Sequence, residues 1–376
     1  MHLEPEVLII GGGLAGLTAA IHLKRLGFAV ALIEKQAYPH HKVCGEYISN
    51  EVLPYLKWLG LDPISLSPTE ITDLQFDSWS GKKIHTKLLL GGFGLSRYTF
   101  DHYLYQFAKA SGVNFITDKV VSVVYLENKF SVVTAAGKTL GSSYVLGAYG
   151  KRSSLDLKLE REFISKNSPY LAVKAHYKST FPNHLVNLNS FPGGYCGVSK
   201  VENDRLNICY LASFKSFKKY KTIKAYQENV LYQNKNLKTI FETSEMILEA
   251  PLTISQISFE NKEPVVNHIL MIGDTAGLIH PLCGNGMAMA VHSAKIACES
   301  IEKHYITRGA RAILEQDYRQ SWQKLFSLRL RFGRLLSTIM QHRYGEQIAI
   351  TALSAMPFLL RNMIKCTHGK PLKATN

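Results

Sequence analysis

The sequence predicts an α/β fold in which a domain built on parallel strands is interrupted by a β-sheet domain and followed by C-terminal helices. Three observations support this prediction. An apolar run at Val7–Ile10 ends in glycines and precedes a segment with helical spacing. A second strand, predicted at residues 268–272, is followed directly by Gly273 and Asp274. Between the two, residues 170–257 alternate mostly as strands do, so one kind of unit encloses another.

The N-terminal unit is predicted to contain a strand, a helix and a second strand. Val7–Ile10 is continuously apolar, as buried parallel strands are. Residues 14–26 carry apolar side chains at helical spacing and stop before Gly27, a residue type common just after helix C-termini. Residues 28–33 form the second strand, and Glu34 stands at its end. These lengths are typical of a βαβ unit.

The remaining elements follow in chain order. Helices are expected at residues 101–111, 214–231 and 286–303 and from Arg311 onward. Strands are expected at residues 113–117, 120–127, 130–135 and 144–148, the first three alternating as antiparallel strands do. The chain is thus expected to form a discontinuous nucleotide-binding domain, an inserted substrate domain and a C-terminal helical segment. Their predicted boundaries are residues 1–75, 95–160 and 260–310, residues 76–94 and 161–259, and residues 311–376, respectively.

The composition restricts the classes of protein to which the chain can belong. Its 376 residues are 46% hydrophobic, enough for a large buried core in two or three domains. The formal net charge is +15, for which nucleic acid, an anionic membrane surface or an acidic ligand are candidate partners. No nucleic acid is expected, because neither zinc-finger spacing nor an RNA-binding aromatic motif accompanies the charge.

Cysteine usage and the lack of long apolar stretches indicate a reduced cytoplasmic protein. None of the six cysteines forms a CxxC pair, so neither a metal site nor a dithiol redox motif is expected. The N-terminus carries acids where a signal peptide carries bases. No run of 18 apolar residues occurs in the sequence, so no membrane-spanning helix is expected.

A glycine motif follows the first predicted strand. Gly11, Gly13 and Gly16 fit GxGxxG between a strand and a helix. Gly11 permits the tight turn, Gly13 lets the backbone approach a pyrophosphate at the helix N-terminus, and Gly16 lets the helix pack closely on the strand. Glu34 is placed to accept hydrogen bonds from an adenosine ribose. In this context the motif predicts a bound dinucleotide, the alternative being a tight turn without a ligand.

A second motif follows the strand at residues 268–272. Gly273 and Asp274 stand at its end, and Gly284 and Gly286 precede the long helix. A carboxylate at a strand end can accept hydrogen bonds from ribityl hydroxyls, and a helix N-terminus favours negative charge on a reduced flavin ring. The alternative is an aspartate that caps a helix. Combined with the GxGxxG motif, this segment predicts FAD.

Together the two motifs resemble the FAD-dependent oxidoreductases of the para-hydroxybenzoate hydroxylase fold, which include aromatic monooxygenases, flavin halogenases and geranylgeranyl reductases. The resemblance covers about residues 5–300. It implies a Rossmann-like, GR2-type FAD-binding domain that holds FAD without a covalent bond. Residues 95–101 resemble the family's Arg-x-x-Phe/Leu-Asp segment, which implies that Arg97 lies near the FAD phosphates. The alternative for Arg97 is a base on the surface.

Two segments are similar to the geranylgeranyl reductase branch. Residues 42–46 resemble its Lys-x-Cys-Gly-Gly/Glu segment, and residues 191–195 resemble its Pro-Gly-Gly-Tyr segment. The sequence also departs from the family. Tyr149 replaces the aspartate of the Gly-Ala-Asp-Gly-x-x-Ser motif, which in the monooxygenases serves both FAD and NAD(P)H. The branch's Tyr-x-Trp-x-Phe-Pro and the halogenases' Trp-x-Trp-x-Ile-Pro are both absent from the sequence.

The motifs and the resemblance together predict two sets of site residues. Those expected to bind FAD are Gly11, Gly13, Leu14, Ala15, Gly16, Glu34, Lys35, Cys44, Arg97, Gly273, Asp274, Gly284, Gly286 and Met287. Those expected to take part in catalysis are Cys44 and Tyr195. A cysteine beside the flavin ring could donate a proton to a substrate carbon, with Glu46 as a relay. The alternative for Cys44 is a small apolar filler in a tight loop.

The resemblance implies an FAD-dependent oxidoreductase that reduces C=C bonds of an apolar isoprenoid, lipid or polyketide substrate. One alternative is a monooxygenase of the same fold that hydroxylates an aromatic or polyketide ring. Another is a flavin-binding electron carrier without catalytic turnover. The electron donor is left open between NAD(P)H and a reduced protein.

The C-terminal segment allows two interpretations. From Trp322 onward nine bases accompany a single acid, Glu346, and residues 347–364 are largely apolar. One interpretation is a pair of helices that closes the substrate domain. The other is an interfacial element that binds an anionic membrane reversibly, which would make the cytoplasmic protein peripheral at the membrane.

Overall fold

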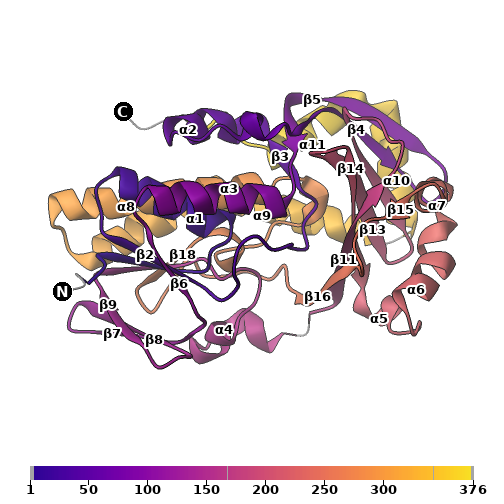
Figure 1. The fold of residues 1–376 in the computed structure, drawn as a ribbon. Helices are drawn as coiled ribbons and strands as arrows, with labels where there is room; N and C mark the ends of the chain where they lie inside the picture. The colour runs from indigo at the N-terminus through magenta and orange to yellow at the C-terminus, as the bar shows by residue number, and fades with distance from the viewer. Residues whose placement is uncertain (1–3, 167, 342, 374–376) are drawn as a thin grey trace.

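Two β-sheets lie side by side in the structure, and helices pack around them (Figure 1). The computed structural model describes residues 4–166, 168–341 and 343–373. The six-stranded sheet contains the first strand of the chain and its last strands, whereas the nine-stranded sheet takes its strands from the chain between them. The predicted α/β fold, with one sheet inserted into the other and helices at the C-terminus, is confirmed.

The six-stranded sheet is almost wholly parallel. Its strands in spatial order are β17 (Val265–Val266), β18 (Ile269–Met271), β10 (Tyr144–Gly147), β1 (Val7–Ile10), β2 (Val30–Glu34) and β6 (Asn114–Thr117). β1 pairs in parallel with β10 and β2, and all four of its residues are buried. Burial on both faces explains why this strand is continuously apolar.

One strand of this sheet differs from its prediction. Residues 113–117 alternate as an antiparallel strand would, but β6 pairs in parallel with β2. β6 is an edge strand with Asn114 and Thr117 exposed, so its alternation reflects partial exposure rather than the direction of its neighbour. The other two strands predicted with it do pair antiparallel. They are β7 (Val120–Leu126) and β8 (Lys129–Thr134), which β9 (Thr139–Ser142) extends into a meander.

Helices cover one face of the six-stranded sheet, and the β7–β9 meander lies on the other side (Figure 1). α1 (Leu14–Arg25) packs against α3 (Arg97–Ala110) and α8 (Gly286–Thr307). Small buried residues in α1 and α8 allow this close packing; they are Ala15, Ala19, Ala20, Ala288, Ala294 and Ala297. The N-termini of α1 and α8 are thereby fixed near the same end of the sheet, where β1 and β18 also end.

The nine-stranded sheet is mostly antiparallel. Its strands are β15 (Glu245–Met246), β11 (Tyr170–Lys178), β14 (Arg205–Ser213), β13 (Gly194–Val201), β12 (Leu185–Phe191), β4 (Thr69–Asp77), β5 (Lys83–Gly94) and β3 (Tyr47–Ser49), with β16 (Leu252–Ile257) paired to β11. Only β4 and β12 among the pairs of this sheet run parallel. β3 and much of β4 come from residues 1–75, the first range predicted for the nucleotide-binding domain. The exact division into domains stays a prediction.

Short helices and a long helical tail complete the fold. α5 (Phe214–Phe217), α6 (Ile223–Asn229) and α7 (Lys235–Glu242) replace the single helix expected at residues 214–231, because Thr222 caps a new helix at α6. α2 (Leu53–Trp58) and α4 (Ser154–Lys158) lie in connections. The tail is helical, as predicted, in α9 (Arg311–Gln341), α10 (Arg343–Ala355) and α11 (Pro357–Thr367). α9 packs on α8 whereas α10 and α11 contact β5, so the tail bridges the two sheets.

Candidate functional site

A cavity of about 720 Å³ takes its lining from both sheets and from the C-terminal helices. All of the residues predicted to bind FAD line this cavity except Gly16, and Tyr195 lines it as well. Gly16 lies in α1 behind the first glycine loop, where an added Cβ would stand 2.0 Å from the Gly11 carbonyl oxygen. The structure therefore brings the two glycine motifs and the Cys44 loop to one site.

The first glycine loop opens the cavity to the N-terminus of α1. Gly11 has φ +106°, and a Cβ there would stand 2.4 Å from the Ala148 carbonyl oxygen, so only glycine fits this turn. Gly13 is the N-cap of α1 and supplies no side-chain cap. A Cβ at Gly13 would approach nothing closer than Arg97 Nη2 at 3.6 Å. Uncapped amides beside open space are what a pyrophosphate requires.

Glu34 lies at the end of β2, as predicted, and also holds the glycine loop. Its Oε2 accepts from the Gly12 backbone N–H at 2.6 Å, and its Oε1 accepts from the Gln36 N–H at 3.1 Å. Tyr38 donates its hydroxyl hydrogen to the Gly12 carbonyl oxygen at 2.5 Å. A carboxylate can accept about four hydrogen bonds, so Glu34 retains capacity for ribose hydroxyls. Its role toward the ribose stays a prediction.

A cluster of charges stands beside the first loop. Arg97 donates from Nε and Nη2 to the two oxygens of Asp101, at 2.7 and 2.8 Å, and Lys42 Nζ lies 2.8 Å from Asp101 Oδ2. Burial would raise the pKa of Asp101, but the two cations and their hydrogen bonds outweigh burial and lower that pKa. Two cations and one carboxylate leave one net positive charge for a phosphate. The side chain of Arg97 is largely buried, so it is not a surface base.

Buried bases hold the second glycine loop from behind. Asp274 lines the cavity within a single 3-10 turn, Gly273–Thr275. Lys262 Nζ donates to the Asp274 carbonyl oxygen at 2.9 Å, and Arg161 Nη1 donates to the Thr275 carbonyl oxygen at 2.9 Å. Burial lowers the pKa of Lys262 to about 8. These bonds occupy the main-chain carbonyls and leave the Asp274 carboxylate as an acceptor toward the cavity.

The N-terminus of α8 is uncapped like that of α1. Its N-cap residue, Asn285, makes no side-chain cap and instead donates Nδ2 to the Thr367 carbonyl oxygen at 2.7 Å and to Glu51 Oε1 at 3.3 Å. Glu51 also accepts from the Gly369 N–H, and its carbonyl oxygen accepts from the Leu372 N–H at 2.8 Å. We call these contacts of Glu51 and Asn285 the C-terminal clasp. It frees the first amides of α8 for a ligand and ties the tail to the same loop.

The residues that line this cavity fit a bound FAD. Two uncapped helix N-termini face it, a net positive charge stands beside the first of them, and Asp274 offers an acceptor near the second. The first helix N-terminus would hold the pyrophosphate and the second the electron-rich edge of the ring. Asp274 would accept from the ribityl chain.

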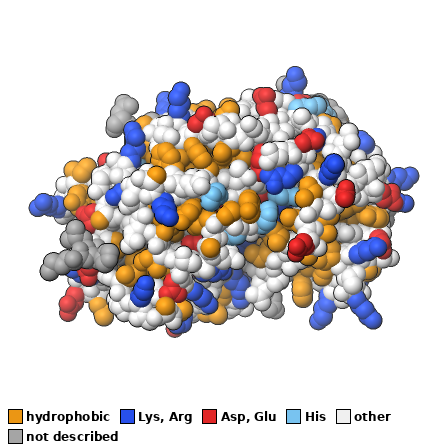
Figure 2. Space-filling view, viewed as in Figure 1, with side chains coloured by type: hydrophobic (Ala, Val, Ile, Leu, Met, Phe, Trp, Pro, Cys, Tyr) orange, Lys and Arg blue, Asp and Glu red, His pale blue; other side chains and the backbone are white. Residues whose placement is uncertain are grey.

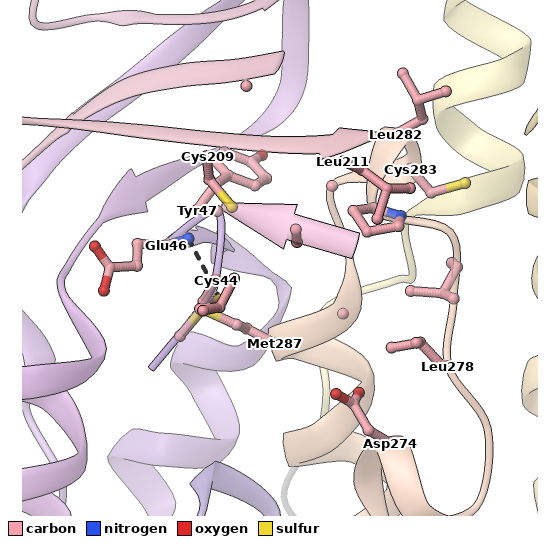
Figure 3. A pocket seen from close by; sticks show the side chains of 18 of the residues that line it. Cys44, Glu46, Tyr47, Cys209, Leu211, Asp274, Leu278, Leu282, Cys283 and Met287 are labelled. Carbon is pink, nitrogen blue, oxygen red and sulfur yellow. Dashed lines mark hydrogen bonds between the residues drawn. The ribbon is translucent and has the colours of Figure 1, made fainter. Parts of the chain in front are cut away.

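Besides the two glycine loops, three cysteines and a tyrosine line the cavity. Figure 3 shows Cys44, Cys209 and Met287 on one side, with Leu278, Leu282 and Cys283 on another. Tyr195 also lines the cavity, and burial raises its pKa well above the ordinary value, so its hydroxyl keeps its proton at neutral pH.

The far part of the cavity is apolar. Its aliphatic and aromatic lining from β4, β5 and β12 consists of Leu74, Phe76, Ile84, Leu88, Val186 and Leu188. The tail contributes Phe332, Leu336, Ile350, Leu353, Leu360, Met363 and Ile364. The C-terminal helices therefore form one wall of this chamber, which agrees with the interpretation that they close the substrate domain.

Several site residues were missed from the sequence. In the sequence, Lys42 stands out only as part of the segment that resembles the reductase branch. Lys262 and Arg161 have no recognisable motif around them, because they donate to main-chain carbonyls more than ten residues away. Apolar spacing does not show what a helix faces, so the tail sequence allows both a pair of helices that closes the substrate domain and a membrane-binding element. Tyr149, which replaces the family's aspartate, does line the cavity, with its hydroxyl 3.6 Å from Met271 Sδ.

Asp274→Ala is expected to weaken FAD retention more than Cys44→Ala does. Loss of a charged acceptor costs about 1.5–3 kcal/mol, whereas a thiol beside the ring does not anchor the cofactor. The FAD dissociation constants of both variants, measured by fluorescence titration of the apoproteins, test this order. Equal affinities would place Asp274 away from the ribityl chain.

The sequence and structure were compared with known proteins. A family model for an FAD binding domain matches residues 4–322. A digeranylgeranylglycerophospholipid reductase of Methanothermobacter thermautotrophicus is 25% identical over 349 residues, which cover 88% of this chain and 87% of the reductase. A tryptophan 2-halogenase of Chondromyces crocatus is 23% identical over 324 residues, or 79% of this chain. The match spans 61% of the halogenase, less than two thirds of its length.

Solved structures share the fold. The flavin-dependent brominase Bmp2 matches with a TM-score of 0.77 at 18% identity, covering 96% of this chain and 93% of the brominase. At this identity the likeness concerns the fold alone, including the inserted sheet and the C-terminal helices.

Proposed function

Because the chain belongs to the FAD binding domain family and is an FAD-dependent oxidoreductase, we propose that it reduces C=C bonds of an apolar isoprenoid, lipid or polyketide substrate. The observation that carries this proposal is the apolar chamber that continues from the flavin side of the cavity to the tail helices. The similarity to a digeranylgeranylglycerophospholipid reductase over most of both chains supports it.

The chamber suits a chain-like hydrocarbon. Its walls come from three strands of the nine-stranded sheet and from α9, α10 and α11, whose apolar side chains face each other across it. Each methylene removed from water contributes about 0.8 kcal/mol, so several isoprene-sized units bind without any polar contact.

The chain's own residues would supply orientation and a proton. Reduced FAD, when bound, supplies a hydride to one carbon of the double bond. The other carbon then takes a proton, for which the Cys44 thiol and the Tyr195 hydroxyl, both lining the cavity, are the candidates. One hydride and one proton account for the two hydrogens gained. His280, next to Tyr195, is a poor alternative, because burial lowers its pKa to about 3 and it is neutral.

The proposal requires an electron donor, either NAD(P)H or a reduced protein. In the resemblance drawn from the sequence, the motif at residues 147–153 serves both FAD and NAD(P)H in monooxygenases. In this chain Tyr149 occupies the position of the motif's aspartate. The nearby carboxylate of Asp156 is not free for a nucleotide, because it pairs with Arg161 at 3.0 Å. This pairing supports a structural role for residues 147–156 rather than a role in binding NAD(P)H.

The bases of the C-terminal tail differ in how far they are exposed. Arg329 lies 3.8 Å from Glu51 Oε1 and its side chain is mostly buried, so it does not belong to a free basic surface. A reversible contact of the tail with an anionic membrane would therefore rest on its other bases, of which Lys324, Arg331, Lys365, Lys370 and Lys373 are exposed. Lys and Arg side chains are scattered over the middle and the margin of the face in Figure 2 and form no single patch there.

Length and apolarity decide whether a helix in the described part of the chain could cross a bilayer. None of its helices alone could cross a bilayer, whereas Gly345–Ala355 and Phe358–Thr367 together reach the required length and apolarity across a bend of 108°.

Product analysis is expected to show a gain of two hydrogens. The protein with bound FAD would be incubated without oxygen, with dithionite as reductant and a lipid extract as substrate, and the products compared by mass spectrometry. The same protein stripped of FAD is the control. A gain of one oxygen in air, with no hydrogenated product, would contradict the reductase proposal and favour the monooxygenase alternative.

A further inference from the structure

A group of charged side chains is buried behind the loop that carries Cys44. Glu46 Oε1 accepts from Lys174 Nζ at 2.5 Å and from the Arg97 backbone N–H at 2.8 Å. Glu46 Oε2 lies 2.6 Å from His176 Nε2. The side chains of Glu46, Lys174 and His176 are at most 1% exposed. Burying ionised groups is unfavourable unless their geometry satisfies them, so this group needs a physical reason.

The partners of Glu46 come from one face of the substrate sheet. Lys174 and His176 are two residues apart on β11 and therefore point to the same side. Asn207 on β14 is paired in register with His176. Asn207 Nδ2 donates to the Cys44 and Gly45 carbonyl oxygens, at 3.2 and 2.9 Å. Two neighbouring strands thus hold the Cys44 loop by its side chain and by its main chain.

The main chain of residues 42–46 is held at every carbonyl. Besides the two bonds of Asn207, Lys174 Nζ donates to the Lys42 carbonyl oxygen at 3.3 Å and Lys151 Nζ to that of Val43 at 3.4 Å. The Glu46 carbonyl oxygen accepts from the Leu95 N–H at 3.1 Å. These bonds come from several segments of the chain, so they define the path of the loop rather than follow from it.

The conformation of Glu46 explains why the loop needs such support. Its φ is +56°, in the left-handed region that non-glycine residues seldom adopt. Glu46 lines the cavity, and Figure 3 shows its carboxylate on the side away from Cys44, while Cys44, two residues earlier, lies beside Met287. A role of this carboxylate as a proton relay for Cys44 stays a prediction.

The charge of Glu46 is fixed by the same partners. Burial would raise its pKa, but Lys174 and His176 outweigh burial and lower it. An ionised carboxylate only accepts, so His176 Nε2 carries a hydrogen. His176 Nδ1 is buried and has no partner among the described residues, and its ring packs edge-on against His41, which lines the cavity.

We propose that Lys174 and His176 are positioning residues that hold the Glu46 carboxylate and thereby fix Cys44 at the flavin side of the cavity. Neither lines the cavity; His176 acts through Glu46, and Lys174 acts through Glu46 and the Lys42 carbonyl oxygen. The inference rests on FAD binding and not on C=C reduction, since any flavin reaction at this site would use the same loop. The nine-stranded sheet would then have a second function besides lining the chamber, because it would fix the conformation of residues 42–46 beside the cofactor.

The test is Lys174→Met in the FAD-loaded protein, with two readouts other than turnover. Without Lys174 the loop loses a bond at Glu46 and one at Lys42 and becomes more open. Alkylation of Cys44 by iodoacetamide at a pH about one unit above the ordinary thiol pKa of about 8.5, where thiols are mostly ionised, is therefore expected to be about tenfold faster, measured by peptide mass spectrometry. The uncompensated Glu46 charge also disfavours adding electrons to the flavin. The midpoint potential is expected to fall by about 30 mV, a tenfold change for a two-electron couple.

Two further variants separate position from charge and from general damage. In Glu46→Gln with Lys174→Met no uncompensated carboxylate remains, so the potential is expected to return toward the wild-type value while Cys44 stays more reactive. Lys200→Met is the matched control, because Lys200 is a buried lysine of the same sheet that pairs with Asp204 and not with the loop. Both readouts should be unchanged in it.

The outcome that overturns the proposal is a folded, FAD-loaded Lys174→Met protein with wild-type Cys44 reactivity and wild-type potential. If that variant does not fold, His176→Phe decides, because it removes one donor to Glu46 and keeps a ring. It is expected to change Cys44 reactivity in the same direction by a smaller factor. An unchanged rate in His176→Phe would then overturn the proposal.

Discussion

Gly13→Ala is expected to weaken FAD binding by about a hundredfold, or about 2.8 kcal/mol at 1.4 kcal/mol per factor of ten, while the protein stays folded. Alanine fits the protein there, because Gly13 has φ −81° and the nearest atom to an added Cβ is Arg97 Nη2, at an ordinary contact distance of 3.6 Å. The new methyl group instead occupies the space through which a pyrophosphate approaches the amides of α1. Fluorescence titration of the apoprotein with FAD measures the effect.

Two other glycines give the matched comparisons. Gly309→Ala, in the connection between α8 and α9, meets only Thr307 Oγ1 at 3.5 Å and should leave FAD affinity unchanged. Gly16→Ala would place a Cβ 2.0 Å from the Gly11 carbonyl oxygen and should lower stability before it affects binding specifically. Wild-type affinity in a folded Gly13→Ala protein would remove the first glycine loop from the cofactor site.

Asp101→Asn is expected to lower the free energy of unfolding of the apoprotein by about 3 kcal/mol. The substitution leaves Arg97 and Lys42 without their shared counter-charge in a site where Asp101 itself is 2% exposed. Urea denaturation followed by circular dichroism measures the difference. Asp317→Asn is the control, because its pair with Lys303 is on the surface and such pairs contribute at most about 1 kcal/mol.

The effect of Asp101→Asn should also depend on pH in a defined direction. Because the pKa of Asp101 is lowered in the folded protein, its stabilising contribution is fully present above its unfolded pKa of about 3.9. It is lost as the pH falls through the lower, folded pKa. The difference in unfolding free energy between the wild type and Asp101→Asn should be constant near pH 7 and shrink below about pH 4. A difference that grows on acidification would contradict the assignment of the charge.

The parts of the fold that could be predicted are those with local signals. An apolar run, glycines and helical spacing within about thirty residues predict β1, α1 and β2. The same kinds of local pattern predict β18 and α8. The direction in which β6 pairs is not local, because an edge strand of a parallel sheet alternates like an antiparallel one. The sheet to which β3 belongs is decided by its pairing with β5, more than forty residues later.

The candidate site divides in the same manner. Gly11, Gly13 and Asp274 were identified because each is needed by a backbone shape or a strand end that the sequence itself displays. Lys174 and His176 could not be identified, since their meaning depends on Glu46, about 130 residues earlier, and a lysine or histidine in an alternating strand has no distinguishing neighbour. The tail's place as a wall of the chamber likewise depends on contacts with β5 that helical spacing cannot report.

The C-terminal clasp makes the timing of synthesis matter for the cofactor. Gly11 is made about 350 residues before Thr367 and Gly369, which Asn285 and Glu51 hold. The walls of the cavity are complete only after nearly the whole described chain has emerged. FAD uptake is therefore expected to follow the synthesis of the clasp residues rather than that of the glycine loop, although the loop comes first in the chain.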